Sequence, residues 1–169
     1  MKIPDQQLRD QRVVFYSKDV ERLDGELDSF LELSGAKCAF LIDREGHLVT
    51  RRGEVLTEST DSLSALVAGS FAATKEMARL LGEGEFASLF HQGAHHSIQI
   101  GLVGARTLMA TLWDDRTNLG LVRFYAAETG RRLQGIFEEM ASRPAGEGSD
   151  DELSGDYGAE ATAALDDLF

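Results

Sequence analysis

Three histidines gather around one glycine in the middle of the chain, and imidazole nitrogens are common zinc ligands. His91, His95 and His96 surround this glycine, and the carboxylates of Glu83 and Glu85 precede them. In a strand, adjacent residues such as His95 and His96 point to opposite faces, so at most one of them can join His91 without a special turn. The spacing therefore favours solvated turn histidines, and we expect neither a metal nor a cofactor.

A second charged group follows a predicted strand, where catalytic residues often lie. Asp114, Asp115 and Arg116 form this group, and Thr117 and Asn118 come directly after it. Short polar side chains before a helix accept hydrogen bonds from its first free N–H groups. Helix capping is therefore the simpler interpretation of this segment.

Motifs that mark common enzyme classes are absent from the sequence. There is no glycine-rich phosphate loop, G-x-S-x-G, C-x-x-C or H-E-x-x-H. We therefore expect a protein without its own active site.

Composition limits the classes further. The chain of 169 residues has 29 acidic and 17 basic side chains, and its net charge of -12 argues against binding nucleic-acid phosphates. Eight acids and one base follow residue 142, a net of -7, so residues 1–142 carry -5. The single cysteine, Cys38, lies in an apolar run and is expected in the core. No run reaches the roughly 18 apolar residues of a membrane span, and the polar start lacks a signal peptide, so we expect a cytoplasmic protein.

Hydrophobic periodicity predicts an alternating order of helices and strands. Three segments have helical spacing or helix boundaries, namely 18–33, 62–81 and 119–142. Strands are predicted at 36–43, 47–52, 86–90, 97–103 and 107–113. Glu45 and Gly46 form the first turn, Gly82 ends the middle helix, and Thr60 or Asp61 can cap it. The order α-β-β-α-β-β-β-α predicts an α+β fold, a five-stranded antiparallel sheet with helices on both faces.

The chain is expected to contain one domain with appendages. Residues 1–12 read as a polar N-terminal lead, and residues 13–142 as the domain. Val13 to Tyr16 fit either a short extended segment or a hydrophobic staple. Residues 143–156 are rich in Gly, Ser and acids, which indicates a flexible linker. Residues 157–169 are helix-prone and end in apolar side chains, so they predict a short helical segment that orders on a partner; a frayed terminus is the alternative.

The helix at 62–81 has two non-polar faces. One face, with the bulkier side chains, is expected to rest on the sheet: Leu63, Leu66, Val67, Ser70, Thr74, Met77, Ala78 and Leu81, flanked by Phe71. The opposite face carries no charge over about two turns: Ala65, Ala68, Gly69 and Ala72. Small side chains let another backbone approach closely, and Gly69 costs about 1 kcal/mol against Ala in a helix. This face is therefore a predicted docking surface, although alanine is also simply a good helix former.

Several motifs together resemble one family. LIDREGHLV, LSALVAGSFAATKEMARLLGEGEFASLFHQG and DDRTNLGLVRFYA are similar to the MglB branch of the Roadblock/LC7 family, with its A-G-x-x-A-A helix, L-G-E-x-x-F exit and F-H-x-G turn. The resemblance spans roughly residues 13 to 142, and the ALDDLF ending is similar to the C-terminal tail of that branch. It implies a profilin-like fold and a homodimer in which sheets join and central helices lie antiparallel.

The resemblance also implies a partner, a small Ras-like (MglA-type) GTPase bound by two copies of this chain. Such regulators stimulate GTP hydrolysis by repositioning the GTPase's own Arg and Gln, in bacterial cell polarity or motility, which allows a location at a cell pole. The implied GTPase-binding residues lie on the middle helix: Ala65, Ala68, Gly69, Ala72, Ala73 and Glu76. A C-terminal segment is implied to contact the GTPase and assist nucleotide exchange: Leu165, Asp166, Asp167, Leu168 and Phe169.

Three alternatives stay open at this point. The protein could be a Roadblock scaffold that only tethers a GTPase. It could also present a catalytic arginine, for which Arg79, Arg106 and Arg116 are candidates that no spacing separates. A ligand-sensing module would need an enclosed apolar pocket of a few hundred Å³, which no sequence feature marks.

Overall fold

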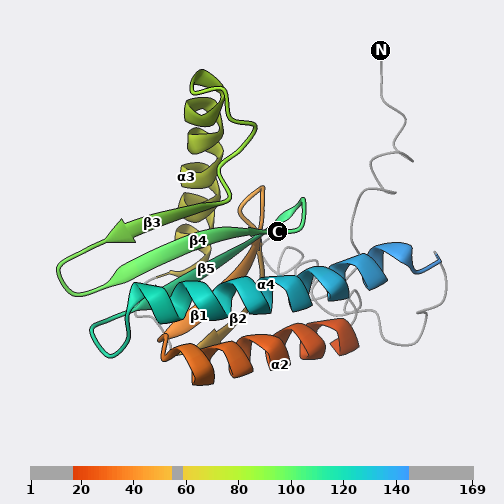
Figure 1. Ribbon diagram of the computed structural model, residues 1–169. Helices are drawn as coiled ribbons and strands as arrows, with labels where there is room; N and C mark the ends of the chain where they lie inside the picture. The colour runs from red at the N-terminus through yellow and green to blue at the C-terminus, as the bar shows by residue number, and fades with distance from the viewer. Residues whose placement is uncertain (1–16, 55–58, 145–169) are drawn as a thin grey trace, which may run out of the picture.

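The order of elements is the predicted one. A computed structural model describes residues 17–54 and 59–144 (Figure 1). Along this part of the chain lie α2 (Ser17–Ser34), β1 (Cys38–Asp43), β2 (Leu48–Gly53), α3 (Thr60–Leu80), β3 (Ser88–Gln92), β4 (Ser97–Val103), β5 (Thr107–Trp113) and α4 (Leu119–Ser142). The third strand starts two residues later than predicted. The carbonyl oxygen of Ala87 accepts one hydrogen bond from Leu102 N–H of β4, at 3.1 Å, and the regular strand pairing begins only at Ser88.

All neighbouring strands are antiparallel, in the order β2-β1-β5-β4-β3. Gly46 supplies the positive φ, +98°, that the β1–β2 turn needs. The last strand thus inserts beside the first, and the central pairing sets Phe40 opposite Ala110 and Ala110 opposite Ile100. Strands β2 and β3 form the two edges, so each leaves one row of backbone groups unpaired within the described sheet.

Helices cover both faces of the sheet, which confirms the predicted fold class (Figure 1). On one face, α2 and α4 pack on the sheet through a core that includes Leu27, Leu133 and Trp113. On the other face, Val67 and Phe71 of α3 pack with the side chains that alternate on that side, among them Cys38. Cys38 is completely buried, as predicted, and burial raises the pKa of its thiol to about 11.

Polar caps fix where the helices begin. The cap of α3 is Ser59, whose hydroxyl accepts a hydrogen bond from Ser62 N–H at 3.3 Å, so the prediction of Thr60 or Asp61 is wrong by one or two residues. The reason is that Thr60 and Asp61 already have helical geometry, whereas Ser59 is extended. Asn118 caps α4 by accepting from Leu121 N–H at 3.0 Å, which supports the capping interpretation of this segment.

Several sequence predictions fall outside the described residues: the lead 1–12, residues 13–16, most of the linker 143–156, and the segment 157–169. Only the first two linker positions are described, and Arg143 binds Asp19 through two hydrogen bonds of 2.9 Å. Position 143 therefore belongs to the folded domain, because Asp19 at the start of α2 is buried and holds it. Within the described ranges, no helix is both long and apolar enough to cross a membrane.

Candidate functional site

The buried side of the central helix α3 overlaps the predicted side only in part, since Val67, Thr74 and Ala78 are buried as predicted. Ser64, Val67, Phe71, Thr74 and Ala78 are buried. By contrast, four residues assigned to the sheet-facing side are exposed: Leu66, Ser70, Met77 and Leu81. At about 100° per residue, the buried side is rotated by roughly 60–70° from the predicted one. The physical reason is that Val67 and Phe71 pack into the core between α3 and the sheet, which leaves Leu66 and Met77 on the outside.

The predicted docking residues mostly lie on the open side. Five of the six are exposed: Ala65, Gly69, Ala72, Ala73 and Glu76. Ala68 is only 5% exposed and packs in the core below α3, so its assignment to the docking surface is wrong. Ala68 lies nearest the sheet-facing side of this group, which explains why it alone is covered. The C-terminal group, residues 165–169, lies outside the described part of the chain.

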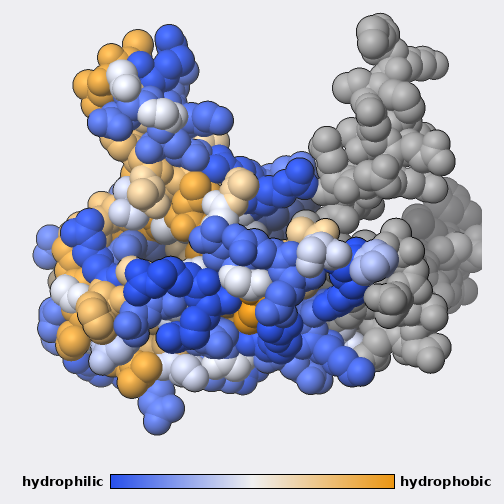
Figure 2. All heavy atoms as spheres, turned by 45° about the vertical axis from the view of Figure 1, so that its right-hand side comes forward, coloured by the Kyte–Doolittle hydropathy of each residue, from blue (hydrophilic) through white to orange (hydrophobic). Residues whose placement is uncertain are grey.

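Large apolar side chains on α3 are exposed next to the small ones. The exposed fractions are 68% for Leu66, 52% for Met77, 72% for Leu80 and 73% for Leu81. The later part of α3 projects beyond the sheet (Figure 1), and one side of this projection carries a hydrophobic patch beside hydrophilic surface (Figure 2). Exposed apolar groups clustered in this way mark an interaction surface.

The open side of α3 therefore carries two parallel stripes. The apolar stripe consists of Leu66, Ala73, Met77 and Leu80, within about 60° of one another around the helix. The small-residue stripe consists of Ala65, Gly69, Ala72 and Glu76, about 80° further round. Sequence analysis missed the apolar stripe, although the seven-residue spacing of Leu66, Ala73 and Leu80 is a signal that could have found it.

A charged clamp holds the exit of α3 against the sheet. Arg44 donates to both carboxylate oxygens of Glu85, at 2.7 and 3.0 Å, and to the carbonyl oxygen of Ala105 at 2.7 Å. Its guanidinium also lies 5.9 Å from the ring centre of Phe71. The bond to Arg44 lowers the pKa of Glu85. Because Arg44 follows β1 and Glu85 follows α3, this clamp fixes how the projecting helix leaves the domain.

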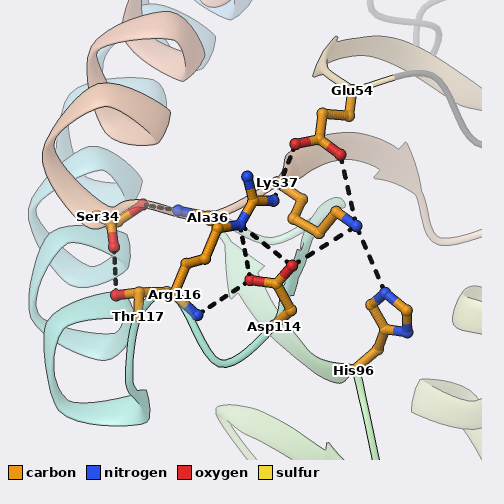
Figure 3. A network of polar contacts seen from close by, with 8 residues as sticks. All are labelled: Ser34, Ala36, Lys37, Glu54, His96, Asp114, Arg116 and Thr117. Carbon is orange, nitrogen blue, oxygen red and sulfur yellow. Dashed lines mark hydrogen bonds and ion pairs between the residues drawn. The ribbon is translucent and has the colours of Figure 1, made fainter.

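The charged group after β5 forms an ion-pair network at one end of the sheet (Figure 3). Arg116 binds Asp114, with Nε 2.9 Å from Oδ1, and also binds Glu54 at 2.9 Å. Lys37 Nζ lies 3.4 Å from Glu54, 3.7 Å from Asp114 and 3.5 Å from the ring of His96. The bonds from Arg116 lower the pKa of Asp114 to about 2, which makes this carboxylate a poor general base. The network joins four connections of the sheet, so its evident role is structural.

Four of the candidate metal and finger residues have other contacts. Glu85 belongs to the clamp with Arg44, and His96 belongs to the network of Figure 3. Arg116 is engaged there too, and Arg79 binds Glu76 one turn earlier on α3, with Nε 2.9 Å from Oε1. Among the three finger candidates Arg79, Arg106 and Arg116, no contact of the described residues therefore singles out one that projects freely.

One group of potential metal ligands occurs in the β1–β2 turn. Asp43, Glu45 and His47 bring their donor atoms within 4.8 Å of one another. Asp43 Oδ1, however, accepts the backbone N–H groups of Glu45 and His47, at 2.9 and 2.8 Å. These bonds are those of a carboxylate that stabilises a turn, so the group is explained by the hairpin itself.

A groove of about 350 Å³ lies between α4 and the outer part of the sheet. It is open to solvent and is lined by both charged and small residues, among them Arg123, Arg131, Gln99 and Gly101. It is thus a surface groove, whereas the ligand-sensing alternative needs an enclosed apolar pocket in the core.

Comparisons with known proteins agree on one family. The Roadblock/LC7 domain matches residues 23–112. Myxococcus xanthus MglB is 37% identical, with a TM-score of 0.67, over 69% of this chain and 95% of that one. The gliding protein MglB of Thermus thermophilus is 32% identical, with a TM-score of 0.69, over 75% of this chain and 96% of that one. An MglB described as having a tetrameric arrangement is also 32% identical, with a TM-score of 0.71 and the same coverage. A comparison with curated proteins gives no match.

Proposed function

The chain belongs to the Roadblock/LC7 family, and we propose that it is a homodimeric regulator of a small Ras-like GTPase. The observation that carries this proposal is the open side of α3, where an apolar stripe and a small-residue stripe lie side by side. Two stripes of different character suit two different partners. We assign the apolar stripe to a second copy, which moves Ala73 from the expected GTPase contacts to the dimer contact, and the small-residue stripe to the GTPase.

The spacing of the apolar stripe supports pairing with a second copy. Leu66 and Leu80 lie seven residues on either side of Ala73. In an antiparallel helix pair with its two-fold axis at Ala73, each Leu66 meets Leu80 of the other copy, and the small alanine lets the helices approach. Such a contact is self-complementary, as a two-fold dimer requires. It would cover the large apolar side chains that one chain leaves exposed.

Strand β3 supports the same arrangement. It is an edge strand of the sheet, it follows α3 directly, and Phe90 on it is 39% exposed. An unpaired edge can join the same strand of another copy and extend the sheet across the dimer. We therefore place the joined sheets along β3, beneath the paired helices.

The small-residue stripe then forms a platform on the outside of the helix pair. The small, uncharged residues Ala65, Gly69 and Ala72 let a partner come close to the helix backbone. Glu76 ends the stripe with a carboxylate that is bound by Arg79. A flat surface of this kind gives shape complementarity without side chains that must first be ordered. Two copies of this chain would form one platform for one GTPase.

We propose that the regulator accelerates hydrolysis without contributing a reactive group. Arg79 and Arg116, two of the three finger candidates, already bind carboxylates of their own chain. Docking instead favours the switch conformation in which the GTPase's own Arg and Gln meet the γ-phosphate, a shift of population that supplies charge stabilisation. We place this activity in bacterial cell polarity or motility.

A single-turnover GTPase assay tests the activating role. The cognate MglA-type GTPase, loaded with GTP, should hydrolyse it faster with saturating dimer than alone. Unchanged hydrolysis together with retained binding would remove the activator and leave the tethering scaffold.

The substitution Ala72→Arg tests the docking face. It places a long charged side chain where a partner backbone must approach, so we expect GTPase binding to be lost while the fold is kept. Ala141→Arg, at an exposed position of α4 far from α3, is the matched control and should bind normally. Wild-type affinity of Ala72→Arg would show that the GTPase uses another surface.

We also propose that the C-terminal segment contacts the GTPase and assists nucleotide exchange. This proposal is supported by the pattern of apolar and acidic residues from Leu165 to Phe169. Deleting residues 157–169 should leave dimerisation unchanged and alter the exchange rate of a fluorescent nucleotide on the GTPase. Equal exchange rates with both proteins would assign no role to this segment.

A further inference from the structure

The groove beside α4 arises from the way the helices cover the sheet. Helix α4 packs over β4 and β5, and the edge strand β3 continues beyond it. Gln99, Gly101 and Thr111 contribute to the floor of the groove, while Arg123 and Arg131 of α4 stand at its wall. The alternation of β4 turns Gln99 and Gly101 toward this side and its isoleucines toward α3.

Two unpaired cations give the groove its charge. Within the described residues, the side chain of neither Arg123 nor Arg131 forms an ion pair or a hydrogen bond. Other arginines of this region are paired, since Arg132 binds Glu26 at 2.7 Å and Arg143 binds Asp19. The two free guanidinium groups lie about two turns apart, so roughly 12 Å of groove presents positive charge.

The floor of the groove contains an unused acceptor. The side-chain oxygen of Gln99 is buried and has no hydrogen-bond partner. A buried acceptor of this kind favours a ligand with N–H donors, since leaving it unpaired costs free energy. An inorganic anion would pair with the arginines but would not satisfy this oxygen. A peptide that carries carboxylates can do both.

The chain itself contains such a peptide. Residues 145–169 include eight acids and no base, and Asp166 and Asp167 lie between Leu165 and Leu168. An apolar contact is available as well, because Phe124 is 58% exposed and lies one turn before Ala127, which lines the groove. Charge, hydrogen-bonding groups and apolar contact are therefore complementary between the groove and the segment 157–169.

The tether has the right length. From Arg143 back to Arg131 and Arg123 the distance along α4 is about 18 and 30 Å. The twelve residues 145–156 reach about 40 Å when extended and about 19 Å on average if they behave as a flexible coil. A tether of this kind gives an effective concentration of about 1 mM. Even a segment that binds with a Kd of about 0.1 mM would then occupy the groove about 90% of the time.

We propose that the groove between α4 and the sheet is a docking site for the C-terminal segment of the same chain, residues 157–169. Arg123 and Arg131 bind its carboxylates, and a backbone N–H of the segment donates to Gln99. A docked segment is withheld from any other protein, so the groove controls its availability. This intrachain contact does not depend on the proposed GTPase partner.

Paramagnetic broadening in the full-length chain tests the proposal. Ala164→Cys provides a single site for a nitroxide label, because the natural Cys38 is completely buried. We expect the label to remove most of the signal intensity of the amide groups at Gly101, Gly130 and Arg131. Unchanged intensities at these amides would overturn the proposal.

Charge reversal shows whether the arginines are responsible. Arg123→Glu with Arg131→Glu should abolish the broadening, whereas Lys18→Glu with Lys75→Glu, which has the same net charge, should keep it. Adding Asp166→Lys and Asp167→Lys to the first pair should restore it. Broadening that survives the arginine reversal, or is lost equally in the lysine control, would contradict a specific contact.

Two further measurements, at high salt and in mixtures of labelled and unlabelled chains, distinguish the intrachain segment from other occupants of the groove. The broadening should weaken near 1 M salt, where the screening length is about 3 Å. If spin-labelled chains broaden the signals of unlabelled chains in a mixture, and the label has no effect within one chain, the groove belongs to a second copy. That result would overturn the intrachain contact. The spin-labelled protein keeps the natural groove residues. The labelling, salt and mixing experiments can therefore be interpreted even if the charge-reversed variant fails to fold.

Discussion

The substitution Leu80→Ala is a direct test of the apolar stripe as the dimer contact. Leu80 is 72% exposed in a single chain and lies opposite Leu66 of the second copy in the proposed antiparallel pair. Removing it should leave the fold of one chain nearly unchanged, because little of the side chain contacts its own domain. The effect should therefore appear in association and not in secondary structure.

The expected magnitude follows from the exposed area. Complete burial of a leucine side chain contributes about 2 kcal/mol. With 72% of Leu80 still available for burial, each copy contributes about 1.4 kcal/mol to the dimer. A two-fold contact contains the residue twice, so the loss is about 3 kcal/mol. We expect the dimer Kd to rise by about 100-fold.

Sedimentation equilibrium over a dilution series measures this change, and circular dichroism checks that helix content is kept. Leu33→Ala is the control, because Leu33 is 52% exposed on α2, on the other face of the sheet. Its dimer Kd should equal that of the wild type. A wild-type Kd for Leu80→Ala would refute the assignment of this stripe to the dimer.

Three further substitutions test the stability of the domain. Gly53→Ala should lower the free energy of unfolding by about 3 kcal/mol or more, since φ is +102° and the new Cβ would lie 2.3 Å from a carbonyl oxygen. Gly69→Ala has open space and should instead stabilise an isolated chain by about 0.5–1 kcal/mol while weakening docking on α3; chemical denaturation that ranks the two variants equally would contradict both assignments. Arg44→Ala should cost about 1–2 kcal/mol at pH 7. Because Arg44 lowers the folded-state pKa of Glu85, this cost should shrink as pH falls below the ordinary value of 4.5, and an equal cost at pH 3 and pH 7 would argue against the ion pair.

Local signals in the sequence determined the elements and their order. The alternation of β4, with Ile98 and Ile100 on one side and Gln99 on the other, predicted both a strand and its two faces. Gly46 and Gly82 marked the turn and the helix end at which the structure has positive φ. Such features depend on neighbouring residues alone, so the sequence is sufficient to predict them.

Tertiary structure decided which side of α3 is buried. Leu66 and Met77 have the apolar character of core residues, yet they are exposed, while Ala68 and Ala78 are buried. Hydrophobicity does not distinguish a core from a partner surface, because both remove apolar groups from water. The choice was made by the packing of Val67 and Phe71 against the strand side chains, which fixes the rotation of the helix on the sheet.

The groove beside α4 was equally invisible in the sequence. Gln99 and Arg131 are 32 positions apart, and they line the same groove only because β4 lies beside β5 beneath α4. No local pattern encodes that strand order. The types of side chain available for recognition were therefore fixed by the sequence, whereas their grouping into a site required the packed sheet and its two helical layers.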